Sequence, residues 1–148
     1  MFWIEGWVEA TRVEPAEPGQ DAWEGVIRLA PLVDVADVVS ERLFGLSKKT
    51  ISSGNLDGAL APRRGVPPSP SPQVRGEIDD IAAHEAQFGA GEYGGYTYAE
   101  WTEIAPLMSS EFPPRTSDWT AVFEMIKLIA ADPRFAAGRV RIVVWYNW

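Results

Sequence analysis

The sequence predicts a single α+β domain over residues 1–148: an antiparallel-rich sheet of three to four strands with about three helices, packed mainly on one face. Three observations predict it. Segments with the period-two alternation of strands occur near both ends of the chain, and segments with helical three-to-four spacing lie between them. With 148 residues, 46% of them hydrophobic, the chain is long enough for one buried core.

The first thirty residues predict two strands joined as an antiparallel hairpin. In residues 2–11 apolar side chains alternate, so Phe2, Ile4 and Val8 should face the core. Residues 14–20 contain two prolines and a glycine and predict a loop. Residues 22–29 resemble a second strand. One of its faces is expected to carry Trp23, Gly25, Ile27 and Leu29.

Three helices follow. The first is expected over residues 34–43, with Asp34 as N-cap and Gly45 after its end. The second should begin at Ser71–Pro72 and stop at Gly89. Its buried stripe is expected to be Val74, Ile78, Ile81, Ala82 and Phe88. The third should run from Ser117 or Asp118 to about residue 131, with a buried stripe of Trp119, Val122, Phe123, Ile126 and Ile129.

Residues 139–148 predict the last strand, because they are dense in β-branched and aromatic side chains. Apolar residues occur on both of its faces, which indicates a central strand. Phe123 and Ile126 should pack against it near Ile142 and Val144. Residues 94–101 predict either a fourth strand or a structured turn.

Residues 46–71 predict a long loop, rich in proline, glycine and serine. The segment is locally basic, with two lysines and two arginines against one aspartate. Residues 67–72, PPSPSP, are expected to favour an extended polyproline conformation.

Composition excludes several kinds of protein. A net charge of −8 argues against a nucleic acid polymer as partner. The chain has no cysteine and one histidine, so we expect neither a metal site nor a cofactor. No apolar run approaches the roughly 20 residues of a membrane span, and the N-terminus lacks a basic leader. We expect a cytoplasmic protein that does not bind membranes.

Motifs with catalytic associations have simpler interpretations here. GAGEYG, residues 89–94, matches a dinucleotide-binding pattern in letters but follows a helix instead of opening one. His84 lacks the second histidine of a zinc protease helix, and a position near a helix C-terminus is favourable for any histidine. Paired acids are interpreted as solvated faces and helix starts. They are Glu5 with Glu9, Asp34 with Asp37, and Asp79 with Asp80.

One combination of residues predicts a ligand site. APRRGVP places Arg63 and Arg64 on a loop stiffened by proline, and EYGGYTYAEW places four aromatic residues beside glycines. They are Tyr93, Tyr96, Tyr98 and Trp101. Arginine forks bind phosphate or carboxylate, and aromatic faces stack on flat groups. The alternative, which general residue behaviour favours, is that the arginines are solvated and the aromatics pack the sheet edge.

Adjacent side chains on an extended loop point to opposite sides. We therefore expect one of Arg63 and Arg64 to anchor the loop to an acidic residue and the other to face the ligand.

FWIEGWVE, ERLFGL, APRRGVP, YTYAEW and VRIVVWYNW together resemble a family of small proteins from actinobacteria and their phages, to which no activity is assigned. The resemblance covers both ends and the centre of the chain and implies a bacterial or phage origin. Members often carry a histidine-containing turn before a T-x-x-E-W-like segment. This chain has GEYGGYTYAEW there, so histidine chemistry in relatives would not transfer to it.

Three functional hypotheses follow. The first is a non-enzymatic protein that binds a small, nucleotide-like anion through the arginine loop and the aromatic turn, and so sequesters a host signal. The second is an interaction or inhibitor module, a homo-oligomer included, that uses an acidic surface and exposed Trp3, Trp7, Trp145 and Trp148. The third, least favoured, is an enzyme that uses His84 and carboxylates.

Overall fold

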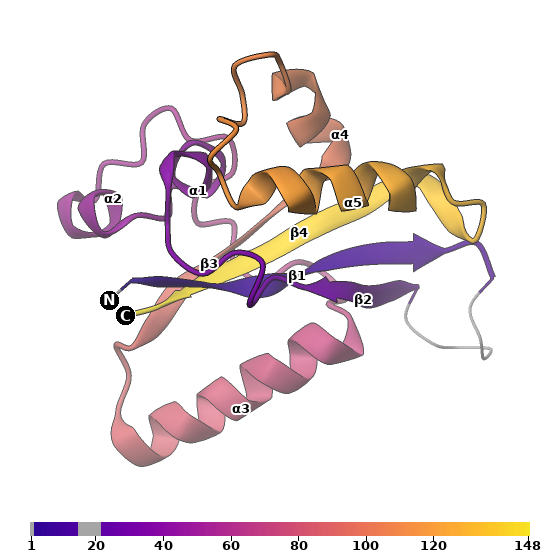
Figure 1. Ribbon diagram of the computed structural model, residues 1–148. Helices are drawn as coiled ribbons and strands as arrows, with labels where there is room; N and C mark the ends of the chain where they lie inside the picture. The colour runs from indigo at the N-terminus through magenta and orange to yellow at the C-terminus, as the bar shows by residue number, and fades with distance from the viewer. Residues whose placement is uncertain (1, 15–21) are drawn as a thin grey trace.

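The computed structural model describes residues 2–14 and 22–148 and contains a four-stranded antiparallel sheet in the order β2-β1-β4-β3. The strands are β1 (Trp3–Arg12), β2 (Trp23–Arg28), β3 (Tyr93–Glu100) and β4 (Phe135–Asn147). The helices are α1 (Val38–Phe44), α2 (Lys48–Ser53), α3 (Pro72–Phe88), α4 (Trp101–Ile104), the short η1 (Ala105–Leu107) and α5 (Trp119–Ala131). Helices α1, α2, α4 and α5 lie on one side of the sheet and α3 on the other (Figure 1). The predicted α+β class is confirmed.

The antiparallel hairpin of β1 and β2 is confirmed, but the predicted common face of β2 was wrong. Val8 pairs with Ile27 and Glu9 pairs with Gly25, so Val26 is an extra residue, a β-bulge. The bulge reverses the alternation along β2. Trp23 and Gly25 therefore lie on the α3 side, and Ile27 and Leu29 lie on the other side. The loop expected at 14–20 lies outside the described residues, apart from Glu14.

Strand β4 is central, as predicted, with β1 and β3 as its neighbours. Val140, Ile142 and Val144 belong to the larger core, which we call the helical-face core, under α1, α4 and α5. Val143 and Trp145 belong to the smaller one, the α3-face core. Residues 93–100 form β3, which answers the choice between strand and turn. Trp101 already begins α4.

Helix α1 begins later than predicted because Asp37, not Asp34, is its N-cap. The Asp37 carboxylate accepts the backbone N–H of Val39 and Ser40 at 2.9 and 3.1 Å, and the Ser40 hydroxyl accepts that of Asp37. The carbonyl of Asp34 accepts the N–H of Ile4 instead, which holds this segment beside β1. Gly45 ends α1 as predicted, at φ 66°.

The segment 46–71 is not a continuous loop. It contains α2, which Ser47 caps through a reciprocal pair of hydrogen bonds with Thr50. The expected polyproline run is interrupted at Ser69, whose φ is 49°. This bend turns two successive carbonyls, those of Pro68 and Ser69, toward Arg141 on β4.

Helices α3 and α5 occupy the predicted segments. Ser71 caps α3, and Gly89 ends it. Val74 and Ile81 are buried and Ile78 half-buried, but Ala82 and Phe88 are exposed, because only a narrow stripe of α3 meets the sheet. Helix α5 buries Trp119, Val122, Phe123 and Ile126 in the helical-face core.

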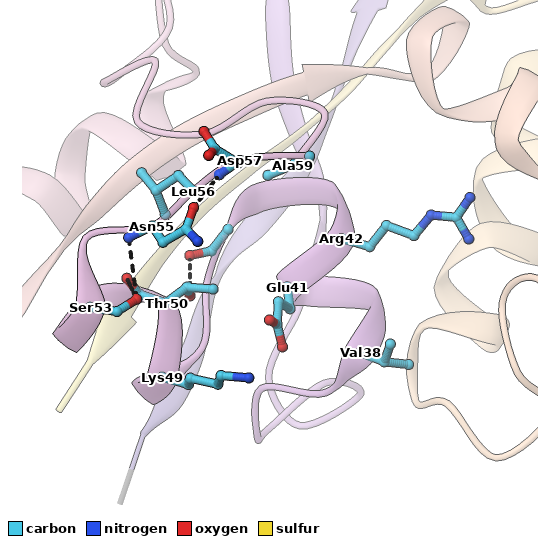
Figure 2. Close-up of a pocket in the computed structure, with 12 residues that line it drawn as sticks. Val38, Glu41, Arg42, Lys49, Thr50, Ser53, Asn55, Leu56, Asp57 and Ala59 are labelled. Carbon is cyan, nitrogen blue, oxygen red and sulfur yellow. Dashed lines mark hydrogen bonds between the residues drawn. The ribbon is translucent and has the colours of Figure 1, made fainter.

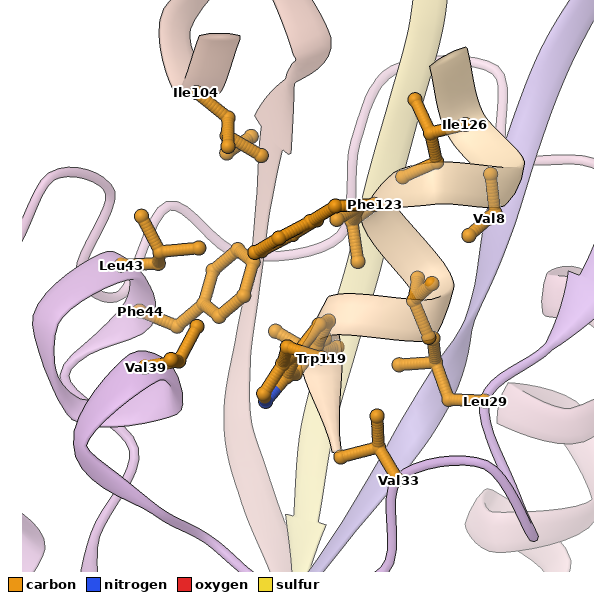
Figure 3. Close-up of a cluster of buried hydrophobic side chains, with 14 of the residues drawn as sticks. Val8, Leu29, Val33, Val39, Leu43, Phe44, Ile104, Trp119, Phe123 and Ile126 are labelled. Atoms are coloured by element: carbon orange, nitrogen blue, oxygen red, sulfur yellow. The ribbon is translucent and has the colours of Figure 1, made fainter. Parts of the chain in front are cut away.

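Aromatic rings contact one another at the centre of the helical-face core, among aliphatic side chains (Figure 3). Trp119 contacts both Phe44 and Phe123, with ring centroids 5.6 and 5.8 Å apart. Phe123 also meets Trp101 at 5.9 Å. Since these rings come from α1, α4 and α5, they join three helices to each other above β4.

The Glu9–Arg141 ion pair is buried on the opposite face. Their side chains are 0% and 4% exposed, and Oε1 and Nε lie 2.6 Å apart. The second Glu9 oxygen accepts the backbone N–H of Ser71, and the Arg141 guanidinium lies 3.8 Å from the centre of the Trp23 ring. The expectation that Glu9 belongs to a solvated face was therefore wrong, because β4 places an arginine beside it.

Truncation of Phe123 to alanine should lower the free energy of unfolding by about 3–5 kcal/mol, because it empties a fully packed ring position. Denaturant unfolding measures it. Leu128→Ala, on the exposed side of the same helix at 73% exposure, should change it by less than about 0.5 kcal/mol. A loss below about 1 kcal/mol for Phe123→Ala would contradict the assigned helix face.

Breaking the buried pair should be costly from either side. Glu9→Gln and Arg141→Met should each destabilise by about 3–5 kcal/mol, since each leaves one buried charge without its partner. The double variant should lose less than the sum of the two single losses. Additive losses in denaturant unfolding would show that the two charges do not stabilise each other. The exposed Arg134–Asp132 pair is the control, and Arg134→Ala should leave the unfolding transition close to that of the parent, because solvent screens this pair.

Candidate functional site

Residues 60–65, which we call the arginine turn, run along the outer edge of β3. The backbone N–H of Gly65 donates to the Tyr96 carbonyl at 2.9 Å, and that of Arg64 donates to the Thr97 hydroxyl at 3.2 Å. The buried Thr97 hydroxyl donates in turn to the carbonyl of Ala61. Two segments that are more than thirty residues apart in sequence are thereby fixed side by side.

Arg64 anchors this turn. Its guanidinium makes two 2.8 Å hydrogen bonds to the two carboxylate oxygens of Glu103 on α4. It also donates to the carbonyls of Tyr98 and Leu60, at 3.3 and 3.5 Å. The guanidinium carbon of Arg64, Cζ, lies 5.7 Å from the centre of the Tyr98 ring. The fork geometry of arginine suits this bidentate contact, so Arg64 is held in one orientation.

The same contact shifts the titration of both partners. The hydrogen bonds from Arg64 hold the pKa of Glu103 below its ordinary value, more than partial burial raises it. The hydrogen bonds to Glu103 likewise raise the pKa of Arg64. Both side chains are about one-third exposed, so solvent screens the pair and its contribution to stability is modest.

Arg63 is the outward-facing member of the turn. Its backbone is left-handed, with φ 49°, and its side chain is exposed. It forms no hydrogen bond or ion pair with any residue in the described ranges. A left-handed conformation is strained for arginine and persists where neighbouring contacts impose it. The contacts of Arg64 and Gly65 are those neighbours.

The six site residues predicted from sequence divide into two groups. Arg64 lies beside Tyr98, Arg63 precedes it in the same turn with an exposed side chain, and the Tyr96 backbone is bonded to that turn. Tyr93 lies at the other end of β3, and Trp101 is buried in the helical-face core, on the opposite side of the sheet from Tyr98.

The Tyr96 side chain lies under α3, with its ring centroid 5.8 Å from that of Trp145. Burial, helped by the charges of Glu85 and Glu5, raises the pKa of Tyr96 to about 12. This hydroxyl therefore keeps its proton at neutral pH. Burial also raises the pKa of Tyr93, at the start of β3.

His84, the histidine considered for acid–base work, lies 2.8 Å from the Glu92 carboxylate, with its ring 4.9 Å from that of Phe88. Within the described ranges, no group of three or more His, Asp or Glu side chains has a geometry that could hold a metal ion. No helix of the described chain is long and apolar enough to cross a membrane.

Sequence reasoning missed Glu103 and Thr97, which hold the arginine turn in place. The available signal was their position in the sequence: Thr97 directly precedes Tyr98, and Glu103 follows Trp101 by two residues. Neither residue predicts a partner in the arginine loop by itself, because that pairing depends on how α4 follows β3.

Comparison with known proteins found no match: no family model, curated protein or solved structure resembles this chain significantly.

The Arg64–Glu103 pair should make stability depend on pH. Because the folded pKa of Glu103 is lowered, its contribution is fully present above the ordinary value of 4.5 and is lost as the pH falls through the lower folded value. At neutral pH, Glu103→Gln should cost about 1 kcal/mol or less of unfolding free energy. At about pH 3 the difference from the parent should shrink. Unfolding curves of the parent and the variant at neutral pH and at about pH 3 measure the difference in unfolding free energy. An equal difference at the two pH values would contradict the pairing.

Proposed function

We propose that this chain is a non-enzymatic binding protein that holds a small nucleotide-like anion against the arginine turn. The observation that carries the proposal is the contrast between two adjacent arginines. Arg64 is fully engaged with Glu103 and two carbonyls, whereas the Arg63 side chain has no partner among the described residues. A cation fixed outward on an anchored turn is available to an incoming anion with little loss of backbone freedom.

The charge of the protein favours a small ligand. With a net charge of −8, a long polyanion would be repelled over most of its length, whereas a single phosphate group meets only the local field of Arg63. Arginine offers that phosphate a planar fork of donors.

Tyr98 supplies the second element of the proposed site. Its half-buried ring lies beside the Arg64 guanidinium, on the strand that the arginine turn follows. A nucleobase held by its phosphate at Arg63 would find this aromatic face, and stacking on such a face tolerates any base. The resemblance to actinobacterial phage proteins extends the proposal to sequestration of a host signalling nucleotide.

A second candidate function, protein interaction, is favoured by two exposed tryptophans near the ends of the chain. Trp3 is 40% exposed and pairs with exposed Val35 in an isolated β-bridge, and Trp148 is 42% exposed, with its ring against those of Phe2 and Tyr146. Trp145 and Trp7 are not available in this way, since Trp145 is buried and Trp7 half-buried under α3. A strictly monomeric protein in sedimentation would count against the homo-oligomeric form of this function.

Single replacements of the two arginines should have unequal effects. Arg63→Ala should weaken the binding of a nucleotide, measured by calorimetry across a nucleotide panel, about tenfold to a hundredfold at unchanged stability. Arg64→Ala should lower the free energy of unfolding by about 1–2 kcal/mol.

Arg115→Ala is the matched control, because it removes an exposed arginine in the segment between η1 and α5. This variant should leave both the nucleotide affinity and the free energy of unfolding unchanged. Absence of binding by any anionic nucleotide, or equal affinity of the parent and Arg63→Ala, would overturn the proposal.

A further inference from the structure

An open hollow lies between α1, α2 and the turn that follows α2 (Figure 2). Its volume is about 350 Å³, at the lower end of the range for small-molecule sites. It is separate from the arginine turn, since neither arginine of that turn lines it. Its walls combine charged, polar and apolar groups.

Charges of both signs face this hollow without neutralising each other. Glu41 enters it from α1 and Lys49 from α2, and Asp57 lies on the turn above them (Figure 2). None of the three side chains forms an ion pair or hydrogen bond with another residue of the described chain. Arg42 also lines the hollow, but its guanidinium is directed away from Glu41 and lies over the Phe112 ring, 4.3 Å from the ring centre, and the Asp57 carboxylate is likewise directed away (Figure 2). The charged groups that face each other in the hollow are therefore the Glu41 carboxylate and the Lys49 ammonium group.

The surrounding backbone is held firmly. The buried Thr50 hydroxyl donates to the Gly45 carbonyl at 2.7 Å, which fixes α2 to the end of α1. On the turn, the Asn55 side-chain oxygen accepts the N–H of Asp57 at 3.1 Å, and the Ser53 hydroxyl accepts that of Asn55. The amide nitrogen of the Asn55 side chain remains available as a donor on the same wall.

The apolar part of the wall is Val38, 57% exposed, together with Leu56. Gly45 lets these elements approach, because its φ is 66° and a Cβ there would lie 2.9 Å from a methyl carbon of Leu56. A ligand in the hollow thus meets an aliphatic surface next to the charged groups.

We infer that this hollow is a binding site for a free α-amino acid with an aliphatic side chain. Glu41 pairs with the ligand ammonium, and Lys49, which faces it from α2, pairs with the ligand carboxylate (Figure 2). The aliphatic side chain lies against Val38, one turn before Glu41 on α1. A ligand of one charge sign fits worse: an anion such as phosphate meets the Glu41 carboxylate, and a simple amine leaves Lys49 unpaired.

Three probes of the same shape test the site by calorimetry: leucine, N-acetylleucine, which lacks the ammonium, and 3-methylbutylamine, which lacks the carboxylate. Leucine should bind with a Kd of about 1 mM or tighter, and each of the other two about tenfold more weakly. No binding of leucine in this range, or equal binding of all three probes, would overturn the assignment.

Variants assign the contacts. Glu41→Gln should weaken leucine binding about tenfold but should not weaken the binding of N-acetylleucine, because that anion has no ammonium for Glu41 to hold. Lys49→Met should weaken leucine binding similarly but should not weaken the binding of 3-methylbutylamine, which has no carboxylate. Asp80→Asn, an exposed carboxylate on α3 across the sheet, is the control and should alter none of the three. Parent-like leucine binding by both Glu41→Gln and Lys49→Met would refute the site, independently of any result at Arg63.

Discussion

The ion pair between Glu9 and Arg141 joins the two central strands and lies where the long segment before α3 meets the sheet. A buried ion pair stabilises a fold only when the other polar atoms of its two side chains also have hydrogen-bond partners. Here Glu9 also accepts the N–H of Ser71, the N-cap of α3, and Arg141 also donates to the carbonyls of Pro68 and Ser69. The pair therefore holds the N-terminal end of α3 to the two central strands, beside the α3-face core.

The arginine turn repeats the same design at the sheet edge. An arginine again binds an acidic residue and donates to backbone carbonyls. Here two hydrogen bonds join Arg64 to Glu103, the carbonyls belong to Tyr98 and Leu60, and both side chains remain in contact with solvent. The turn covers β3, and the Gln73 side chain accepts an N–H of β2 at the opposite edge. Both edges that could pair with another chain are thus partly occupied by the protein itself.

The segment 46–71 contributes to two separate surfaces, one at the arginine turn and one at the hollow beside α2. This segment is irregular in sequence, yet its hydrogen bonds to β3 and its helix α2 fix the backbone at Arg63 and at Lys49. An ordered backbone loses little further freedom when a group binds to it.

Sequence by itself determined the features that depend on near neighbours. Alternation assigned β1 and both faces of β4, helical spacing found α3 and α5, and Ser71 and Gly89 marked the ends of α3. Tertiary structure decided what depends on partners far along the chain. Glu9 and Arg141 are 132 residues apart and pair because β1 and β4 are neighbours in this register. Arg64 and Glu103 are 39 residues apart and pair because the arginine turn runs along β3, after which α4 begins. The bulge in β2 likewise redirects a face because one extra residue reverses a period of two.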